Sequence, residues 1–198
     1  LVQTIPAYRL PREVLAREIR MIERLGVDIE TGKRMGKDFT LASLKDDGYD
    51  AAFIGVGAQK PVMLGIKGED ADGVVDALDF LREYNLRGSV KVGQKVVIIG
   101  GGNAAVDAAR TALRLGASEV TILYRRTREE MPAYTEEIEE AQQEGVVLKT
   151  LSAPVEVITE ENVVTGLLCC NMTLGEFDRS GRRRPEGESD NNFTIEAD

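Results

Sequence analysis

Three consecutive glycines follow a short apolar run in the second half of the chain. The run covers residues 96–99, and the residues after it are Gly100, Gly101, Gly102, Asn103, Ala104 and Ala105. This spacing is a G-x-G-x-x-G motif with alanine in the third glycine position. Gly100 suits a tight strand-to-helix turn, and Gly102 lets a pyrophosphate approach the backbone. We therefore expect a Rossmann-type dinucleotide site, with a glycine turn that binds no ligand as the alternative.

An arginine cluster begins about twenty residues beyond this motif. It consists of Arg125, Arg126 and Arg128. Sites that prefer NAD carry an acidic residue in this region to bind the ribose 2′-hydroxyl. Guanidinium groups instead form charge-assisted hydrogen bonds with a 2′-phosphate, which favours NADP(H). The alternative is a solvated basic turn balanced by Glu129 and Glu130.

The remaining polar candidates are expected to do no chemistry. Asp107 is interpreted as a polar surface position, and the three arginines at 182–184 as a solvated turn rather than a docking patch. The exposed face of an acidic helix is expected to carry Glu136, Glu137, Glu139 and Glu140. The adjacent Cys169 and Cys170 fit neither a metal-ligand spacing nor a CxxC redox pair, so we expect reduced strand residues.

The composition argues against several classes of function. A net charge of −9 and a pI near 4.8 are unfavourable for general binding to nucleic acid or anionic membranes. The chain has no histidine, which excludes His-ligated metal sites and serine-type triads. No apolar run approaches the ~20 residues that cross a bilayer, and no leader opens the chain. We therefore expect a cytoplasmic protein without a metal site.

The first half of the chain has mixed signals. We expect a helix from Pro11 to Leu25, because its apolar residues recur every three or four positions and Gly26 follows. A short strand at 27–29 and a buried strand at 49–56 are also expected. A loop at 59–73 then leads to a second helix at about 75–84.

The second half alternates regularly between strand and helix patterns. The expected order is strand 96–99, helix 104–115, strand 120–124, helix 132–144 and strand 146–150. Such an order predicts an α/β fold with a parallel sheet in a three-layer unit, in which 96–99 is the central strand. A hairpin of strands 155–159 and 163–174, an exposed excursion at 175–192 and a return to the sheet at 193–197 complete the prediction.

Several motifs in order resemble a known family. They are 5–15 (IPAYRLPREVL), 57–61 (GAQKP), 65–70 (GIKGED), 100–105 (GGGNAA) and 123–133 (LYRRTREEMPA). Together they resemble the small (beta) subunit of NADPH-dependent glutamate synthase. The same FAD- and NAD(P)H-binding module occurs in dihydropyrimidine dehydrogenase and in subunits of several iron-sulfur oxidoreductases. The resemblance covers nearly the whole chain.

The resemblance implies a flavoprotein in which an NADPH domain is inserted into an FAD domain. Residues 1–90 would be part of the FAD-binding domain, where Gly57 and Ala58 meet the flavin. Residues 91–198 would be a C-terminally truncated NAD(P)H-binding domain. The glycine motif would bind the pyrophosphate, and the arginine cluster would bind the 2′-phosphate, with Arg128 as its third ligand.

The sequence also departs from this family. It has no N-terminal GxGxxG for FAD and no cysteine clusters for iron-sulfur centres, and it stops before a second flavin-contacting segment. We therefore expect a fragment that is inactive alone. Its first ninety residues should expose an apolar patch, and so should either form a homodimer or be mobile.

The function implied is delivery of hydride from NADPH to FAD in an oxidoreductase, and the electrons would pass to a partner subunit or an iron-sulfur protein. The alternative is a non-catalytic nucleotide-binding or docking module of an iron-sulfur electron-transfer complex. A self-contained short-chain dehydrogenase is excluded, because no tyrosine here has a lysine four residues later.

Overall fold

A computed structural model describes residues 1–57, 60–178 and 181–198, without the side chains of 189 and 190. The chain divides into two compact units. Unit 1 comprises Leu1–Arg9 and Val62–Asp198, and unit 2 comprises Leu10–Pro61. Ala58, an expected flavin-contacting residue, lies outside the described residues.

Unit 1 contains the expected parallel sheet and its crossover helices. In chain order these are β1 (Lys95–Ile99), α4 (Asn103–Arg114), β2 (Glu119–Leu123), α5 (Thr135–Gln143) and β3 (Val147–Lys149). The strands are parallel in the order β1-β2-β3. The α/β prediction is confirmed, but β2 is the central strand of this sheet, so the central position predicted for 96–99 is wrong.

A second sheet is antiparallel and consists of β4 (Ser152–Glu160), β5 (Val163–Phe177) and β6 (Arg183–Glu196). The predicted hairpin between β4 and β5 is confirmed. Its turn residues Glu161 and Asn162 have φ of 49° and 67°. These left-handed values match the twist of a two-residue hairpin.

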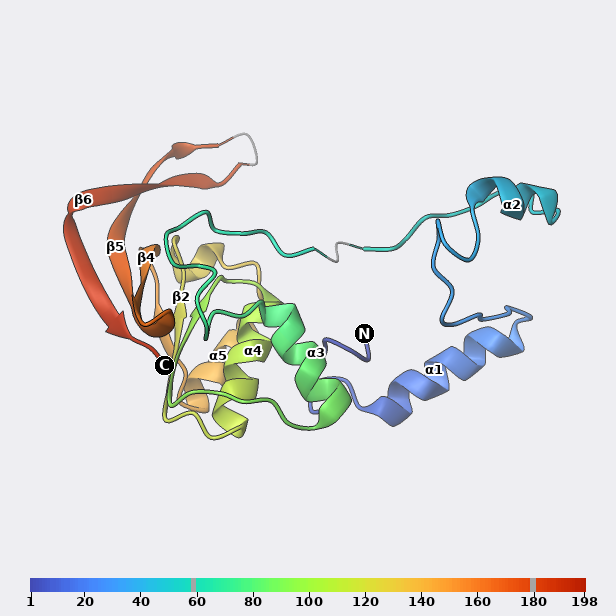
Figure 1. Cartoon of the computed structure of the whole chain (residues 1–198), viewed down its shortest axis with the longest axis horizontal. Helices are drawn as coiled ribbons and strands as arrows, with labels where there is room; N and C mark the ends of the chain where they lie inside the picture. The colour runs from blue at the N-terminus through green and yellow to red at the C-terminus, as the bar shows by residue number, and fades with distance from the viewer. Residues whose placement is uncertain (58–59, 179–180) are drawn as a thin grey trace. The chain divides into compact units, whose positions relative to one another are not determined.

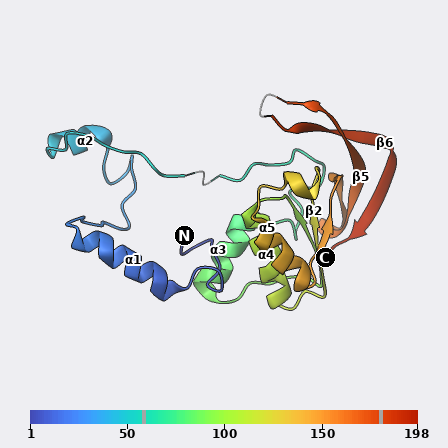
Figure 2. The ribbon, with the colours of Figure 1, turned by 180° about the vertical axis from the view of Figure 1, so that it is seen from behind.

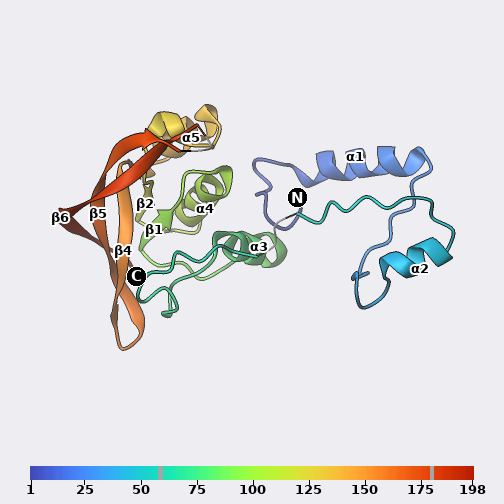
Figure 3. The ribbon, with the colours of Figure 1, turned by 90° about the horizontal axis from the view of Figure 1, so that it is seen from above.

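The two sheets and the helices form three layers, as Figure 3 shows. One face of the parallel sheet, including Ile98 and Ile122, packs against α4 and α5. Figure 2 shows these two helices side by side, with α3 (Ala77–Arg87) on the same side of the sheet. The other face, including Val97 and Leu123, packs against β4 and β5. Alternation along β1 and β2 therefore buries both faces of the sheet, which confirms the expected three-layer unit.

The excursion expected at 175–192 is largely strand. Met172 pairs with Gly187 and Thr173 with Glu186, so β5 and β6 continue as the two-stranded ribbon visible in Figure 1. Residues 193–196 lie in β6 and pair with β5. The expected exposure is confirmed, because most described residues of 175–192 are exposed. The strands were not predicted, because this ribbon is rich in glycine, glutamate and arginine, and its pairing depends on a partner strand rather than on a buried face.

Unit 2 contains α1 (Arg12–Arg24) and α2 (Leu41–Asp46). The first confirms the predicted helix, and a capping box between Thr40 and Ser43 starts the second. The strands expected at 27–29 and 49–56 are not formed. No described residue of unit 2 is buried, and Phe53 is 98% exposed. An apolar run becomes a strand only where it can pair and pack, and unit 2 offers neither among its described residues.

Candidate functional site

The glycine turn connects β1 to α4. Gly100 has φ of +139°, a backbone angle that residues other than glycine rarely adopt. Its N–H donates to the carbonyl oxygen of Leu123 at 3.0 Å. The turn therefore lies beside the carboxyl end of the central strand β2. Gly102 is the N-cap of α4, and the helix continues for 12 residues.

The start of α4 presents free backbone donors. Within the described part of the chain, no group accepts a hydrogen bond from the N–H of Asn103 or Ala104. A Cβ built on Gly102 would meet no heavy atom within 4 Å. Open space beside these donors, at the positive end of the helix dipole, fits the pyrophosphate of a dinucleotide.

Gly101 serves a purpose that sequence reasoning missed. A Cβ at Gly101 would lie 2.6 Å from Cε2 of Tyr124, the buried residue that follows β2. Only glycine therefore allows the turn to lie against this ring. An aromatic residue directly after the second strand is the one sequence signal for this contact.

The three arginines of the cluster have different surroundings. Arg125 is exposed. Arg126 has a side chain that is 6% exposed, and its Nε donates to the carbonyl oxygen of Arg183 at 2.8 Å. Its Nη2 also lies 3.3 Å from Oδ2 of Asp178, so Arg126 fastens the β5–β6 ribbon to the end of β2. Its role as a phosphate ligand stays a prediction.

Arg128 opens a short 3-10 helix, Arg128–Glu130, and forms a half-exposed ion pair with Glu139 at 3.2 Å. Because both partners are exposed to solvent, this pair is weak, and a phosphate can compete for the guanidinium. Of the three arginines near the carboxyl end of β2, Arg125 and Arg128 are thus the two that solvent reaches.

Asp107 is buried, so its interpretation as a polar surface position is wrong. It is 3% exposed, and Arg9 donates to its Oδ2 at 2.6 Å. Burial raises the pKa of Asp107, and the charge of Arg9 opposes this effect. The sequence pattern missed this pair because Arg9 comes from the other end of unit 1.

Contrary to the prediction from the sequence pattern, the glutamates of the acidic helix α5 do not all face solvent. Arg110 on α4 is buried and pairs with Glu137, Glu140 and Glu144. The Tyr8 ring lies under the Arg110 and Arg114 guanidinium groups at 5.0 and 3.9 Å. Burial raises the pKa of Tyr8 to about 12, so its hydroxyl stays protonated. Glu137 and its neighbours therefore hold α5 and the segment before α1 against α4.

The cysteines are strand residues, as predicted. Both lie in β5 and neither is in a disulfide. Burial raises the pKa of Cys169 to about 11. Among the described residues, no group of three His, Cys, Asp or Glu side chains is arranged to hold a metal ion.

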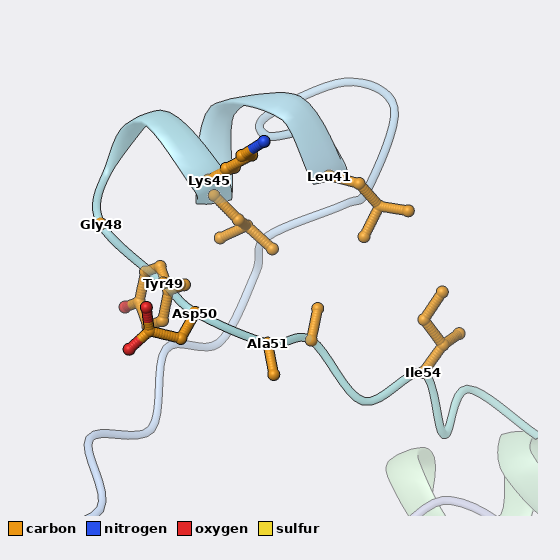
Figure 4. Close-up of a pocket in the computed structure, with 9 residues that line it drawn as sticks. Leu41, Lys45, Gly48, Tyr49, Asp50, Ala51 and Ile54 are labelled. Atoms are coloured by element: carbon orange, nitrogen blue, oxygen red, sulfur yellow. The ribbon is translucent and has the colours of Figure 1, made fainter.

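Unit 2 contributes the expected flavin-contacting residue Gly57, which is exposed and has φ of +71°. Unit 2 also has an open hollow of about 490 Å³ between α2 and the segment after it. Figure 4 shows Leu41 and Lys45 on the helix, with Tyr49 and Ile54 on the segment opposite. The hollow has no buried polar group that would orient a ligand.

The described helices are all too short or too polar to cross a membrane.

Comparisons with known proteins agree with this geometry. A family model described as pyridine nucleotide-disulphide oxidoreductase matches residues 5–176. The NADPH-Fe(3+) oxidoreductase subunit beta of Geobacter sulfurreducens is 46% identical over an alignment of 198 positions, which covers 98% of this chain and 29% of that protein. The NADPH glutamate synthase small chain of Escherichia coli is 36% identical over an alignment of 206 positions, which covers 98% of this chain and 43% of that protein.

A solved structure, Mycobacterium tuberculosis FprA in complex with NADPH, matches with a TM-score of 0.80 at 20% identity. This match covers 100% of the chain and 59% of FprA, and it shows the fold alone. The chain spans less than half the length of both curated relatives. The resemblance to the glutamate synthase small subunit is confirmed, and the chain belongs to the pyridine nucleotide-disulphide oxidoreductase family.

Proposed function

We propose that the chain is the NADPH-binding portion of a flavin-dependent oxidoreductase, similar to the glutamate synthase small subunit, that delivers hydride from NADPH to FAD. The observation that carries the proposal is the glycine turn, where free N–H groups face open space beside Gly102. The exposed Arg125, on the neighbouring strand end, supports NADP(H) in particular. Both named relatives carry NADPH in their descriptions.

Each part of the nucleotide has a proposed place. Gly100, Gly102 and the amides of Asn103 and Ala104 hold the pyrophosphate, and Ala105 allows the turn to pack closely on the helix. Arg125 binds the 2′-phosphate. Arg126 and Arg128 add positive charge to the same loop. Their guanidinium groups already form ion pairs with Asp178 and Glu139.

Hydride transfer from NADPH to a flavin does not require an acidic or basic side chain of the protein. The glycine turn at residues 100–105 and Arg125 would hold the nicotinamide nucleotide, which would supply a hydride to a bound flavin. This step depends on positioning rather than on a protein acid or base, which agrees with the absence of histidine from the sequence.

FAD binding is proposed for the full-length protein. We propose that residues 1–90 are part of the FAD-binding domain, with Gly57 near the flavin, and that residues 91–198 are the NAD(P)H-binding domain. Unit 2 has no strand and no buried residue in its described part, so it does not form a flavin cradle by itself. The electron acceptor is a partner subunit or an iron-sulfur protein, and the location is the cytoplasm.

Calorimetric titration of the chain with NADP⁺ and NAD⁺ tests the proposal. Each arginine contact with the 2′-phosphate is worth about 1.5–3 kcal/mol, and ~1.4 kcal/mol is one decade of affinity. We therefore expect a preference for NADP⁺ of at least about tenfold. Arg125→Ala should remove most of this preference and leave the affinity for NAD⁺ unchanged, and added salt should reduce the preference.

Arg184→Ala is the matched control, because it removes an equal charge from another exposed site of unit 1. It should leave both affinities unchanged. Equal affinity of the wild type for both nucleotides would overturn the NADP(H) assignment. Binding of neither nucleotide would favour the alternative, a docking module of a larger electron-transfer complex.

A further inference from the structure

Tyr124 closes the loop that presents the arginine cluster. Its hydroxyl donates to the carbonyl oxygen of Glu130 at 2.8 Å, and its side chain is buried. Arg125 therefore lies in a loop whose two ends are joined by a hydrogen bond. Within this loop, the N–H and hydroxyl of Thr127 donate to Oε2 of Glu130 at 3.3 and 3.1 Å.

The same residue also supports the glycine turn. The Tyr124 ring lies so close to Gly101 that a Cβ there would be 2.6 Å from Cε2. The segment after the arginine loop returns to this turn, because Ala133 donates its N–H to the carbonyl oxygen of Gly101 at 3.1 Å. The N–H of Tyr134 donates to Oδ1 of Asn103 at 3.1 Å.

Tyr124 thus contacts both ends of the nucleotide site with different parts of its side chain. Its ring lies against the turn proposed for the pyrophosphate, and its hydroxyl holds the loop proposed for the 2′-phosphate. The ring lies against the turn that NAD and NADP would share, whereas the hydroxyl directly holds the loop that carries Arg125.

We propose that Tyr124 is a specificity-determining positioning residue, whose hydroxyl holds the Arg125 loop in the geometry that selects a 2′-phosphate. This inference rests on the proposed function. Its physical basis is preorganisation, because a loop closed before binding loses less conformational freedom when its arginines engage the phosphate.

The test compares affinities for NADP⁺ and NAD⁺ in the wild type and Tyr124→Phe. The substitution removes the hydroxyl and keeps the ring beside Gly101. One hydrogen bond corresponds to a change of about 2- to 10-fold, so the affinity for NADP⁺ should fall by this factor. The affinity for NAD⁺ should stay within about twofold, since the turn keeps its support.

Tyr134→Phe is the matched control. It removes the hydroxyl of an exposed tyrosine in the same segment, and this hydroxyl makes no hydrogen bond within the described residues. It should leave the NADP⁺ to NAD⁺ ratio unchanged. Thr127→Val opens the same loop at a second hydrogen bond and should lower the ratio in the same direction, so it carries the test if Tyr124→Phe does not fold.

The outcomes separate this inference from the proposed function. A wild type that binds neither nucleotide would overturn the proposed function, and the inference with it. A wild type that prefers NADP⁺, with an unchanged ratio in Tyr124→Phe and Thr127→Val, would overturn the inference alone. Equal losses for both nucleotides would also overturn it, because they would show a purely structural role.

Discussion

Replacing Gly102 by alanine should separate nucleotide binding from folding. Gly102 has φ of −91° and ψ of 171°, which alanine adopts without strain, and its Cβ would meet no heavy atom within 4 Å. Alanine is a poorer N-cap than glycine but reduces the entropy of the unfolded chain. These effects oppose one another, so the free energy of unfolding should change by less than about 1 kcal/mol.

Nucleotide binding should respond much more strongly. In the proposed site, the added methyl group occupies the space through which the pyrophosphate reaches the N–H groups of Asn103 and Ala104. Losing one charge-assisted hydrogen bond of about 1.5–3 kcal/mol lowers affinity by at least about tenfold. NADP⁺ and NAD⁺ should lose affinity equally, because they share the pyrophosphate.

Gly101→Ala is the matched comparison. Here the Cβ would lie 2.6 Å from Tyr124, so the ring must move. Overpacking of this kind costs about 1–3 kcal/mol, which for a chain of this size lowers the melting temperature by roughly 2–12 °C.

Thermal unfolding followed by circular dichroism measures stability, and calorimetric titration measures affinity. If Gly102→Ala folds like the wild type and also binds nucleotide like the wild type, then the space beside Gly102 is not the pyrophosphate site. If Gly101→Ala is as stable as the wild type, then the Tyr124 ring does not constrain the turn.

Two further predictions concern titratable groups outside the nucleotide site. Arg9→Met leaves the buried Asp107 carboxylate without its ion pair, which should raise the pKa of Asp107 further and cost about 3 kcal/mol. Because the folded-state pKa then lies above the unfolded value, this loss should be small near about pH 4 and grow towards about pH 7. Urea unfolding of the wild type, Arg9→Met and the exposed control Arg17→Met measures this loss of stability at each pH. A loss that does not depend on pH would contradict the presence of a buried ion pair between Arg9 and Asp107. In the second prediction, a thiol reagent at about pH 8 should modify Cys170 well before Cys169, whose pKa is raised to about 11 by burial. Cys170→Ser should therefore abolish rapid labelling, and rapid labelling of that variant would show that β5 opens.

The sequence alone was sufficient to predict the strand, turn and helix around Gly100, since these depend on local patterns. An apolar run, a glycine with positive φ and a helix start lie within about ten residues of one another. The arginine cluster was also predicted correctly to follow the second strand. Because neighbouring parallel strands end at the same edge of a sheet, these two local patterns were enough to propose one site.

Other features depend on residues that are distant in the chain, and only the tertiary structure decided them. From the sequence, Asp107 was predicted to be a surface residue, but in the structure it is buried and pairs with Arg9. The hydrogen bond from Arg126 to the backbone of β6 was likewise not predicted. The run at 49–56 has a strand's composition but forms no strand, because it has no partner within unit 2. A sequence pattern reports local backbone preference and which faces are apolar. It does not report which distant segment covers a face or neutralises a buried charge, and those contacts determine burial, strand pairing and the fit of Gly101 against Tyr124.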